Sequence, residues 1–165
     1  MVGLFFNLIL VLAAAETPCQ HDDSTFRCVK YIKNYDGDTL TFDIPNVPAI
    51  IGRKTNVRVA DLDTPEMKGK LPCEKQAART AQKLIENLLK NAKQVHLENV
   101  ERDKYFRILA TVIVDGRSLK DILMKNNLAY TYHGETKQKL DWCAKLRLPA
   151  DTKEPLVPFA KKPLE

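Results

Sequence analysis

Alternating apolar and polar residues, with many β-branched and aromatic side chains, predict five strands along the chain. The five stretches are Cys28–Tyr35, Thr39–Ile44, Val57–Asp63, Val95–Asn99 and Tyr105–Val114. Asp-Gly turns at positions 36–37 and 115–116 follow the first and the last of them. In the third stretch, strict alternation would place Asp61 and Asp63 on one face and Arg58 on the other.

Two helices are predicted by apolar residues at helical spacing. Seven apolar residues share one face of the first helix: Ala77, Ala81, Leu84, Ile85, Leu88, Leu89 and Ala92. Ser118 and Asp121 resemble a capping box, and they predict a second helix with Leu119, Ile122 and Leu123 facing inward. Three strands, a helix, two strands and a helix favour an α+β fold that is mainly β. We expect a five-stranded OB-fold barrel with two to three helices, the kind of barrel that binds oligonucleotides on one face.

The N-terminus has the pattern of an export signal. Residues 2–15 are almost wholly apolar and end in three alanines, so we expect cleavage near Ala15 and a secreted or periplasmic protein. An uncleaved anchor or a buried helix is the alternative. No apolar stretch of the chain reaches the roughly 20 residues of a membrane-spanning helix, so no stable membrane insertion is expected. We divide the rest into an N-terminal segment (16–27), a barrel domain (28–144) and a proline-rich tail (145–165).

Composition narrows the function classes only slightly. The chain has 165 residues, 44% of them hydrophobic and 28% charged, which excludes wholesale disorder and suits one globular domain. Lys and Arg number 26 and Asp and Glu 21, giving a net charge of +5. That excess is compatible with a polyanionic partner such as nucleic acid, although many unrelated proteins are equally basic.

Four cysteines allow three disulfide connectivities. We favour Cys19 with Cys28, which closes a short loop, and Cys73 with Cys143, which ties the middle of the chain to its end. A zinc site is the alternative, but no two cysteines have Cys-x-x-Cys spacing. The three histidines are scattered, and we expect surface or ordinary structural roles for them.

Three segments carry complementary chemistry at predicted strand ends. They are Asp36-Gly37-Asp38, Arg58 followed by Asp63-Thr64-Pro65-Glu66, and Asp103-Lys104-Tyr105-Phe106-Arg107. Carboxylates and carbonyl oxygens suit hard cations such as Ca²⁺ or Mg²⁺, and two guanidinium groups can bind an attacked phosphate. A further carboxylate can take a proton from water. Together these are the parts of a phosphodiester hydrolase.

Each segment also has an ordinary explanation. The first could be a simple turn, Arg58 could form a surface ion pair with Asp61 or Asp63, and the third could be an exposed hairpin. The combination argues against three independent coincidences.

In this order and spacing, the three segments resemble the staphylococcal nuclease (thermonuclease) family over about residues 28–133. The resemblance implies a five-stranded OB barrel with Ca²⁺, or less favourably Mg²⁺, held by Asp38, Asp63 and the carbonyl of Thr64. It implies that Arg58 and Arg107 contact the scissile phosphate, and that Glu66 orients or deprotonates the attacking water.

The same resemblance implies hydrolysis of DNA and RNA with little sequence preference, leaving 3′-phosphate ends. Lys104 and Tyr105 match positions that hold a terminal phosphate, and Tyr130 and Tyr132 match positions of stacking tyrosines. We expect a monomer. A non-catalytic OB-fold module that binds nucleic acid is the alternative function.

The chain departs from the staphylococcal pattern in places. Phe106 stands where that pattern has glycine, and the loop at residues 67–73 is shorter. Cys73 and the pair Trp142-Cys143 resemble a cysteine-containing exported bacterial branch of the family, which adds support for the pairing of Cys73 with Cys143.

Overall fold

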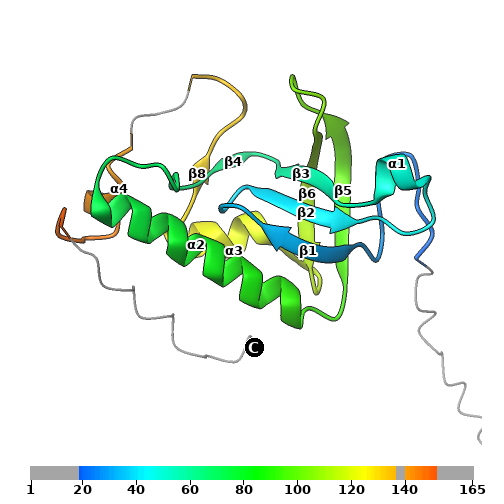
Figure 1. Cartoon of the computed structure of the whole chain (residues 1–165), viewed down its shortest axis with the longest axis horizontal. Coiled ribbons are helices and arrows are strands. Elements are labelled where there is room, and N and C mark those ends of the chain that lie inside the picture. The colour runs from blue at the N-terminus through cyan, green and yellow to red at the C-terminus, as the bar shows by residue number, and fades with distance from the viewer. Residues whose placement is uncertain (1–18, 137–139, 152–165) are drawn as a thin grey trace, which may run out of the picture.

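The computed structural model describes residues 19–136 and 140–151, and Figure 1 shows a sheet flanked by helices. Strands pair in the order β1-β2-β3-β6-β5, with β7 on β6, and β4 pairs separately with β8. The strands are β1 (Lys30–Asn34), β2 (Thr39–Asp43), β3 (Thr55–Val59), β4 (Leu62–Asp63), β5 (Val95–Arg102), β6 (Ile108–Val114), β7 (Arg117–Ser118) and β8 (Tyr130–Thr131). The helices are α1 (Ala49–Gly52), α2 (Pro72–Asn91), α3 (Leu119–Lys125) and α4 (Trp142–Lys145).

The sheet is antiparallel except where β3 pairs in parallel with β6. Arg58 lies opposite Thr39 of β2 and Leu109 of β6, which puts it in the middle of the sheet. The segment before β1 reaches β5, because Phe26 N donates to Leu97 O at 2.8 Å. The result is a mixed α+β fold, and full closure of the strands into a barrel stays a prediction.

The core lies between the sheet and α2. Buried side chains of α2 include Ala77, Ala81, Ile85 and Leu89, as the helical spacing predicted. Ala81, Ile85 and Leu89 share one core cluster with apolar residues of β2, β3, β5 and β6, such as Phe42, which is fully buried. Burial of this continuous apolar face is what holds α2 against the strands.

Two predicted local features are confirmed. Ser118 caps α3, because its Oγ accepts a hydrogen bond from Asp121 N at 3.4 Å. The predicted disulfides are both present: Cys19 with Cys28, and Cys73 with Cys143. The second joins the first turn of α2 to α4 across a sequence separation of 70. It thereby ties α4 to the body of the domain.

One expectation about the third strand is wrong. Strict alternation placed Asp61 and Asp63 on the same face, but Asp61 is exposed while Asp63 is only 4% exposed. The reason is that β3 ends at Val59 and Asp61 adopts a left-handed backbone with φ of 57°. The chain turns there, so β4 begins with a new facing.

Within residues 19–136 and 140–151, no helix is both long and apolar enough to cross a membrane. The predicted signal at residues 1–15 and most of the predicted tail, from residue 152 on, lie outside the described residues. The domain boundaries stay predictions.

Candidate active site

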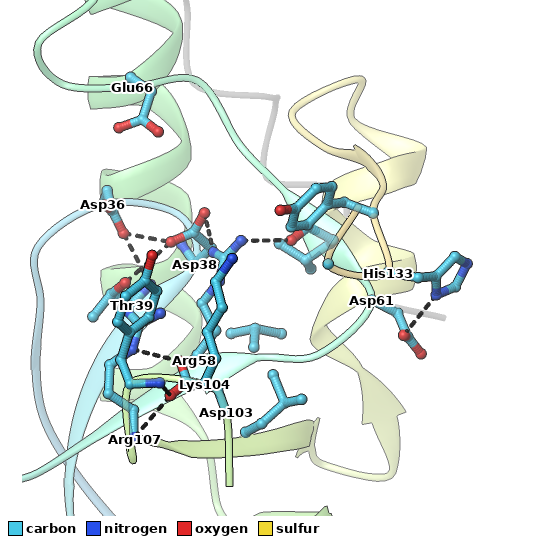
Figure 2. Close-up of a pocket in the computed structure, with 16 residues that line it drawn as sticks. Asp36, Asp38, Thr39, Arg58, Asp61, Glu66, Asp103, Lys104, Arg107 and His133 are labelled. Carbon is cyan, nitrogen blue, oxygen red and sulfur yellow. Dashed lines mark hydrogen bonds and ion pairs between the residues drawn. The ribbon is translucent and has the colours of Figure 1, made fainter. Parts of the chain in front are cut away.

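A cleft of about 560 Å³ opens between the turn that joins β5 to β6 and the segment that follows β8. Its floor is formed by the turn before β2 and by the end of β3, and Figure 2 shows the side chains that line it. The three segments that sequence analysis singled out all contribute side chains, through Asp38, Arg58 and Arg107 among others. Chain segments far apart in sequence therefore meet in one hollow.

Arg58 is the central side chain of the floor, and it is only 9% exposed. Its guanidinium forms an ion pair with Asp38 through Nη1, and its Nη2 lies 3.2 Å from Asp63 Oδ1. The same Nη2 donates to the carbonyl of Leu62 at 3.0 Å. Two buried carboxylates thus converge on one buried guanidinium. Buried ion pairs offset the cost of desolvating their charges only when their geometry is good.

The turn before β2 holds Asp38 in place. Asp36 Oδ1 accepts hydrogen bonds from the backbone N–H of Asp38 at 3.1 Å and of Thr39 at 2.9 Å. The Thr39 hydroxyl donates to Asp38 Oδ1 at 3.1 Å. Gly37 is required here because a Cβ at this position would lie 2.7 Å from the side chain of buried Thr64. The Asp-Gly turn is therefore built to orient a carboxylate and is more than a chain reversal.

Asp63 has its own support from β8. The Tyr130 hydroxyl donates to Asp63 Oδ2 at 2.9 Å, and Tyr130 is only 7% exposed. Tyr130 also lies against Trp142 of α4, with ring centroids 5.9 Å apart. The disulfide between Cys73 and Cys143 anchors α4, so α4 supports Tyr130 and, through it, Asp63.

The opposite wall is the turn between β5 and β6. Asp103 Oδ2 accepts from Arg107 Nε at 2.7 Å, while its Oδ1 accepts from the backbone N–H of Tyr105 and of Arg107. Burial raises the pKa of the Asp103 carboxyl, but these hydrogen bonds outweigh it and leave the pKa below its usual range. Lys104 Nζ and the Arg107 guanidinium lie 5.4 and 5.5 Å from the Tyr105 ring centre. Two cations and an exposed aromatic ring therefore sit together on the wall.

The outer edge of the cleft carries Glu66, Tyr132 and a polar pair. In Figure 2 Glu66 lies at the upper edge of the view, away from Arg58. On the other side His133 Nδ1 lies 2.9 Å from Asp61 Oδ1, with Lys120 Nζ 3.9 Å from the second oxygen of Asp61. The cleft thus has buried ionic chemistry at its floor and exposed ionisable groups at its rim.

Comparison with known proteins gives the same assignment as this geometry. A family model described as staphylococcal nuclease homologue matches residues 56–149. The chain belongs to the staphylococcal nuclease homologue family. Two proteins of Bacillus subtilis (strain 168) are similar to it. Endonuclease YncB is 35% identical over 128 residues, which cover 74% of this chain and 58% of that protein. SPbeta prophage-derived endonuclease YokF is 36% identical over 107 residues, covering 62% of this chain and 34% of that protein. The chain therefore spans less than two thirds of either relative.

Most residues expected from the staphylococcal nuclease resemblance come together in the cleft. Seven of them line it: Asp38, Arg58, Glu66, Lys104, Tyr105, Arg107 and Tyr132. Asp63 and Thr64 are buried next to the floor, with 4% and 2% exposure. Tyr130 is apart from the lining, because its ring is buried and its hydroxyl is bound to Asp63.

Asp36 and Asp103 belong to the segments identified from the sequence, but their role in positioning other residues was not predicted. Asp36 and Asp103 each accept two backbone hydrogen bonds that fix a neighbouring functional side chain. The spacing of an aspartate two residues before a backbone donor is a known turn signal and could have identified both. The pairing of His133 with Asp61 spans 72 positions, so no local pattern could have revealed it.

The carboxylates at the floor of the cleft are possible ligands for a metal ion. Among residues 19–136 and 140–151, no three His, Cys, Asp or Glu side chains gather as a metal cluster. Asp38 and Asp63 nevertheless bring two negative charges to a floor where Arg58 supplies one positive charge. Buried oxygen donors with excess negative charge suit a hard divalent cation. In charge and in ligand type, the two carboxylates therefore suit such an ion.

Proposed function

We propose that this protein is a secreted, metal-dependent nuclease that hydrolyses phosphodiester bonds of DNA and RNA with little sequence preference. The observation that carries the proposal is the meeting of Arg58 and Arg107 with buried carboxylates in one cleft. The relatives named as endonucleases support it, and so does the positive net charge of +5.

The two arginines would act on the phosphate. Their planar donor forks suit two oxygens of a phosphodiester and the additional charge that develops when the phosphorus is attacked. Glu66 would accept a proton from the attacking water or orient that water. The water oxygen forms a bond to phosphorus, the bond from phosphorus to the 5′-oxygen breaks, and the leaving oxygen takes a proton from solvent. The products would carry 3′-phosphate and 5′-hydroxyl ends.

Asp38, Asp63 and the main-chain carbonyl of Thr64 would hold the ion, and we propose Ca²⁺ ahead of Mg²⁺. When bound, it would supply Lewis-acid stabilisation of the phosphoryl oxygens. Ca²⁺ accepts irregular arrangements of oxygen ligands, whereas Mg²⁺ demands near-ideal octahedral geometry. A site made from two carboxylates and one carbonyl suits the more tolerant ion. Hydrogen bonds from Thr39 and Tyr130 would keep the two carboxylates oriented toward it.

The wall and rim would bind the nucleic acid strand. Lys104 and Tyr105 would hold a phosphate, and Tyr132 would offer its ring to a base. We assign Tyr130 to support of Asp63 rather than to stacking, because its buried hydroxyl is already bound there. Stacking and phosphate contacts carry little sequence information, which agrees with a general nuclease.

Export is part of the proposal. The two disulfides suit an oxidising compartment, and the apolar residues 2–15 suit a cleaved signal. N-terminal sequencing of the exported protein tests this, and an intact Met1 in the product would contradict cleavage.

The function is tested by incubating purified protein with single-stranded DNA, duplex DNA and RNA in Ca²⁺, in Mg²⁺ and in chelator. We expect cleavage in Ca²⁺, loss of cleavage in chelator, and 3′-phosphate ends in the products. Glu66→Gln should lower the rate, whereas the control Glu86→Gln, in an exposed pair with Lys90 on α2 and away from the residues that line the cleft, should not. Undiminished cleavage in chelator would contradict the metal assignment. No cleavage under any condition would favour the non-catalytic binding module.

A further inference from the structure

Phe106 occupies a backbone position that is suited to glycine. Asp103 N donates to Arg107 O at 3.0 Å and Phe106 N donates to Asp103 O at 2.9 Å, which closes a tight turn between β5 and β6. In turns of this kind the last loop residue takes a left-handed conformation, and Phe106 has φ of 62°. Glycine adopts this conformation freely, but a bulky side chain is strained there.

Most of the other left-handed positions among the described residues are filled by more tolerant residues. Five of the nine non-glycine residues with positive φ in the described chain are Asn or Asp, whose short polar side chains accommodate it. Phe106 is the one aromatic residue in that set. Arg102 Nη1 donates to the carbonyl of Phe106 at 2.6 Å, and so helps to hold the unusual backbone.

The ring of Phe106 contributes little to folding. Phe106 is 82% exposed, so its apolar surface is not removed from water by the rest of the chain. A single exposed apolar residue is ordinary on a protein surface. One that has a strained backbone and lies at the edge of a functional cleft points to a contact with another molecule. Its neighbours Tyr105 and Arg107 line the cleft, and Phe106 itself lies beyond the lining. Figure 1 shows the turn between β5 and β6 projecting past the sheet.

We infer that Phe106 stacks on a nucleobase of the bound strand just outside the cleft, and thereby favours unpaired over paired substrate. This inference rests on the proposed nuclease function. A base is the partner that the surroundings favour, because Lys104 and Arg107, which lie close to Phe106 in sequence and line the cleft, attract the phosphates that flank a base. Any base offers a flat face, so the contact is compatible with low sequence preference. In a duplex both faces of a base are already stacked, so the ring has no access.

The inference predicts a dependence on substrate length. A mononucleotide phosphodiester that ends within the cleft cannot reach Phe106, whereas a single-stranded oligonucleotide can. Loss of the ring should therefore raise KM for the oligonucleotide more than for the short ester. The expected rise is about 5- to 150-fold, which corresponds to the free energy of about 1–3 kcal/mol for stacking one base.

The test compares wild type with Phe106→Gly, Phe106→Trp and Phe106→Leu in the full chain. Glycine relieves the left-handed strain, so thermal unfolding of Phe106→Gly should occur at or above the wild-type temperature. Its KM for a single-stranded oligonucleotide should rise relative to KM for the short ester, Trp should restore it, and Leu should not. Ile50→Ala removes a 95% exposed apolar side chain of α1 outside the cleft, and should leave all constants at wild-type values.

The inference would be overturned if the ratio of the KM for the oligonucleotide to the KM for the short ester were the same in wild type and in Phe106→Gly. It would also be overturned if Phe106→Leu kept the wild-type ratio. If wild type cleaves both substrates and this ratio is unchanged in Phe106→Gly, the inference fails but the proposed function is still supported. If wild type cleaves no substrate, the proposed function fails. Affinity for a labelled single-stranded oligonucleotide then decides the inference. Weaker binding by Phe106→Gly supports stacking, and equal binding overturns it.

Discussion

The two arginines of the cleft have the same chemical group in opposite surroundings. The Arg58 side chain is 11% exposed and is paired with carboxylates that are 10% and 6% exposed. The Arg107 side chain is 35% exposed, and its carboxylate partner Asp103 belongs to the same turn. The floor is therefore part of the folded interior, while the wall is a local structure that depends on its own turn. It follows that changes at the floor should affect folding and chemistry together, whereas changes at the wall should separate them.

The largest effect on stability is expected from Arg58→Leu. Removal of the guanidinium leaves Asp38 and Asp63 buried without their shared partner, and breaking such a pair lowers the free energy of unfolding by about 3–5 kcal/mol. Urea denaturation followed by circular dichroism measures the change. The matched control is Arg27→Leu, whose pair with Asp22 is partly exposed, and it should change stability far less than Arg58→Leu does. Equal losses of stability in the two variants would contradict the expectation that the buried ion pairs of Arg58 contribute more than a pair at the surface.

Tyr130→Phe should have the next largest effect. It removes the hydroxyl that donates to Asp63, and hydrogen bonds to charged groups contribute about 1.5–3 kcal/mol. The control Tyr105→Phe alters a ring that is 68% exposed and should stay within about 0.5 kcal/mol of wild type. Denaturation of both variants measures the difference. Wild-type stability of Tyr130→Phe would mean that Asp63 does not depend on the support from β8.

Arg107→Leu should destabilise the protein by less than about 1 kcal/mol, because the pair that it breaks is partly exposed. The same denaturation measurement applies, so this variant is directly comparable with Arg58→Leu. A loss of about 3 kcal/mol or more at Arg107 would remove the proposed distinction between floor and wall.

The smallest effect is the response of the wall to acid. The pKa of Asp103 is lowered in the folded protein, so its contribution to stability is present above its ordinary pKa and is lost as pH falls through the folded pKa. Wild type should therefore lose more stability than Asp103→Asn between pH about 5 and pH about 2. Parallel pH profiles for the two proteins would contradict the hydrogen-bond pattern at this turn.

Sequence periodicity was enough for the elements that bury a regular apolar face. The spacing of Ala77, Ala81, Ile85 and Leu89 predicted α2, and these four side chains are buried as expected. The residues of β4 were predicted as the end of the third strand, and β8 was missed, because each of these strands has two residues and depends on the other, with Leu62 opposite Thr131. No local pattern encodes a pairing between such distant positions.

The site was predictable as far as its residue types and their order resemble a known family. That resemblance identified Arg58, Asp63 and Arg107, but it assigned Tyr130 to stacking by position alone. The hydrogen bond between Tyr130 and Asp63 spans 67 positions and arises from the pairing of β4 with β8. Asp61 was misplaced because its left-handed backbone interrupts the alternation of the strand. Hydrogen bonds between distant residues and local departures from regular backbone geometry could therefore not be predicted from the sequence.

The central claim is that this cleft cleaves phosphodiesters with both arginines. The most direct test measures initial rates of DNA cleavage in Ca²⁺ by wild type, Arg58→Lys and Arg107→Lys, with thermal unfolding of each. Lysine keeps the charge but loses the planar fork, so both rates should fall about 100-fold or more, and Arg107→Lys should unfold like wild type. Near-wild-type rates in both variants would contradict the account.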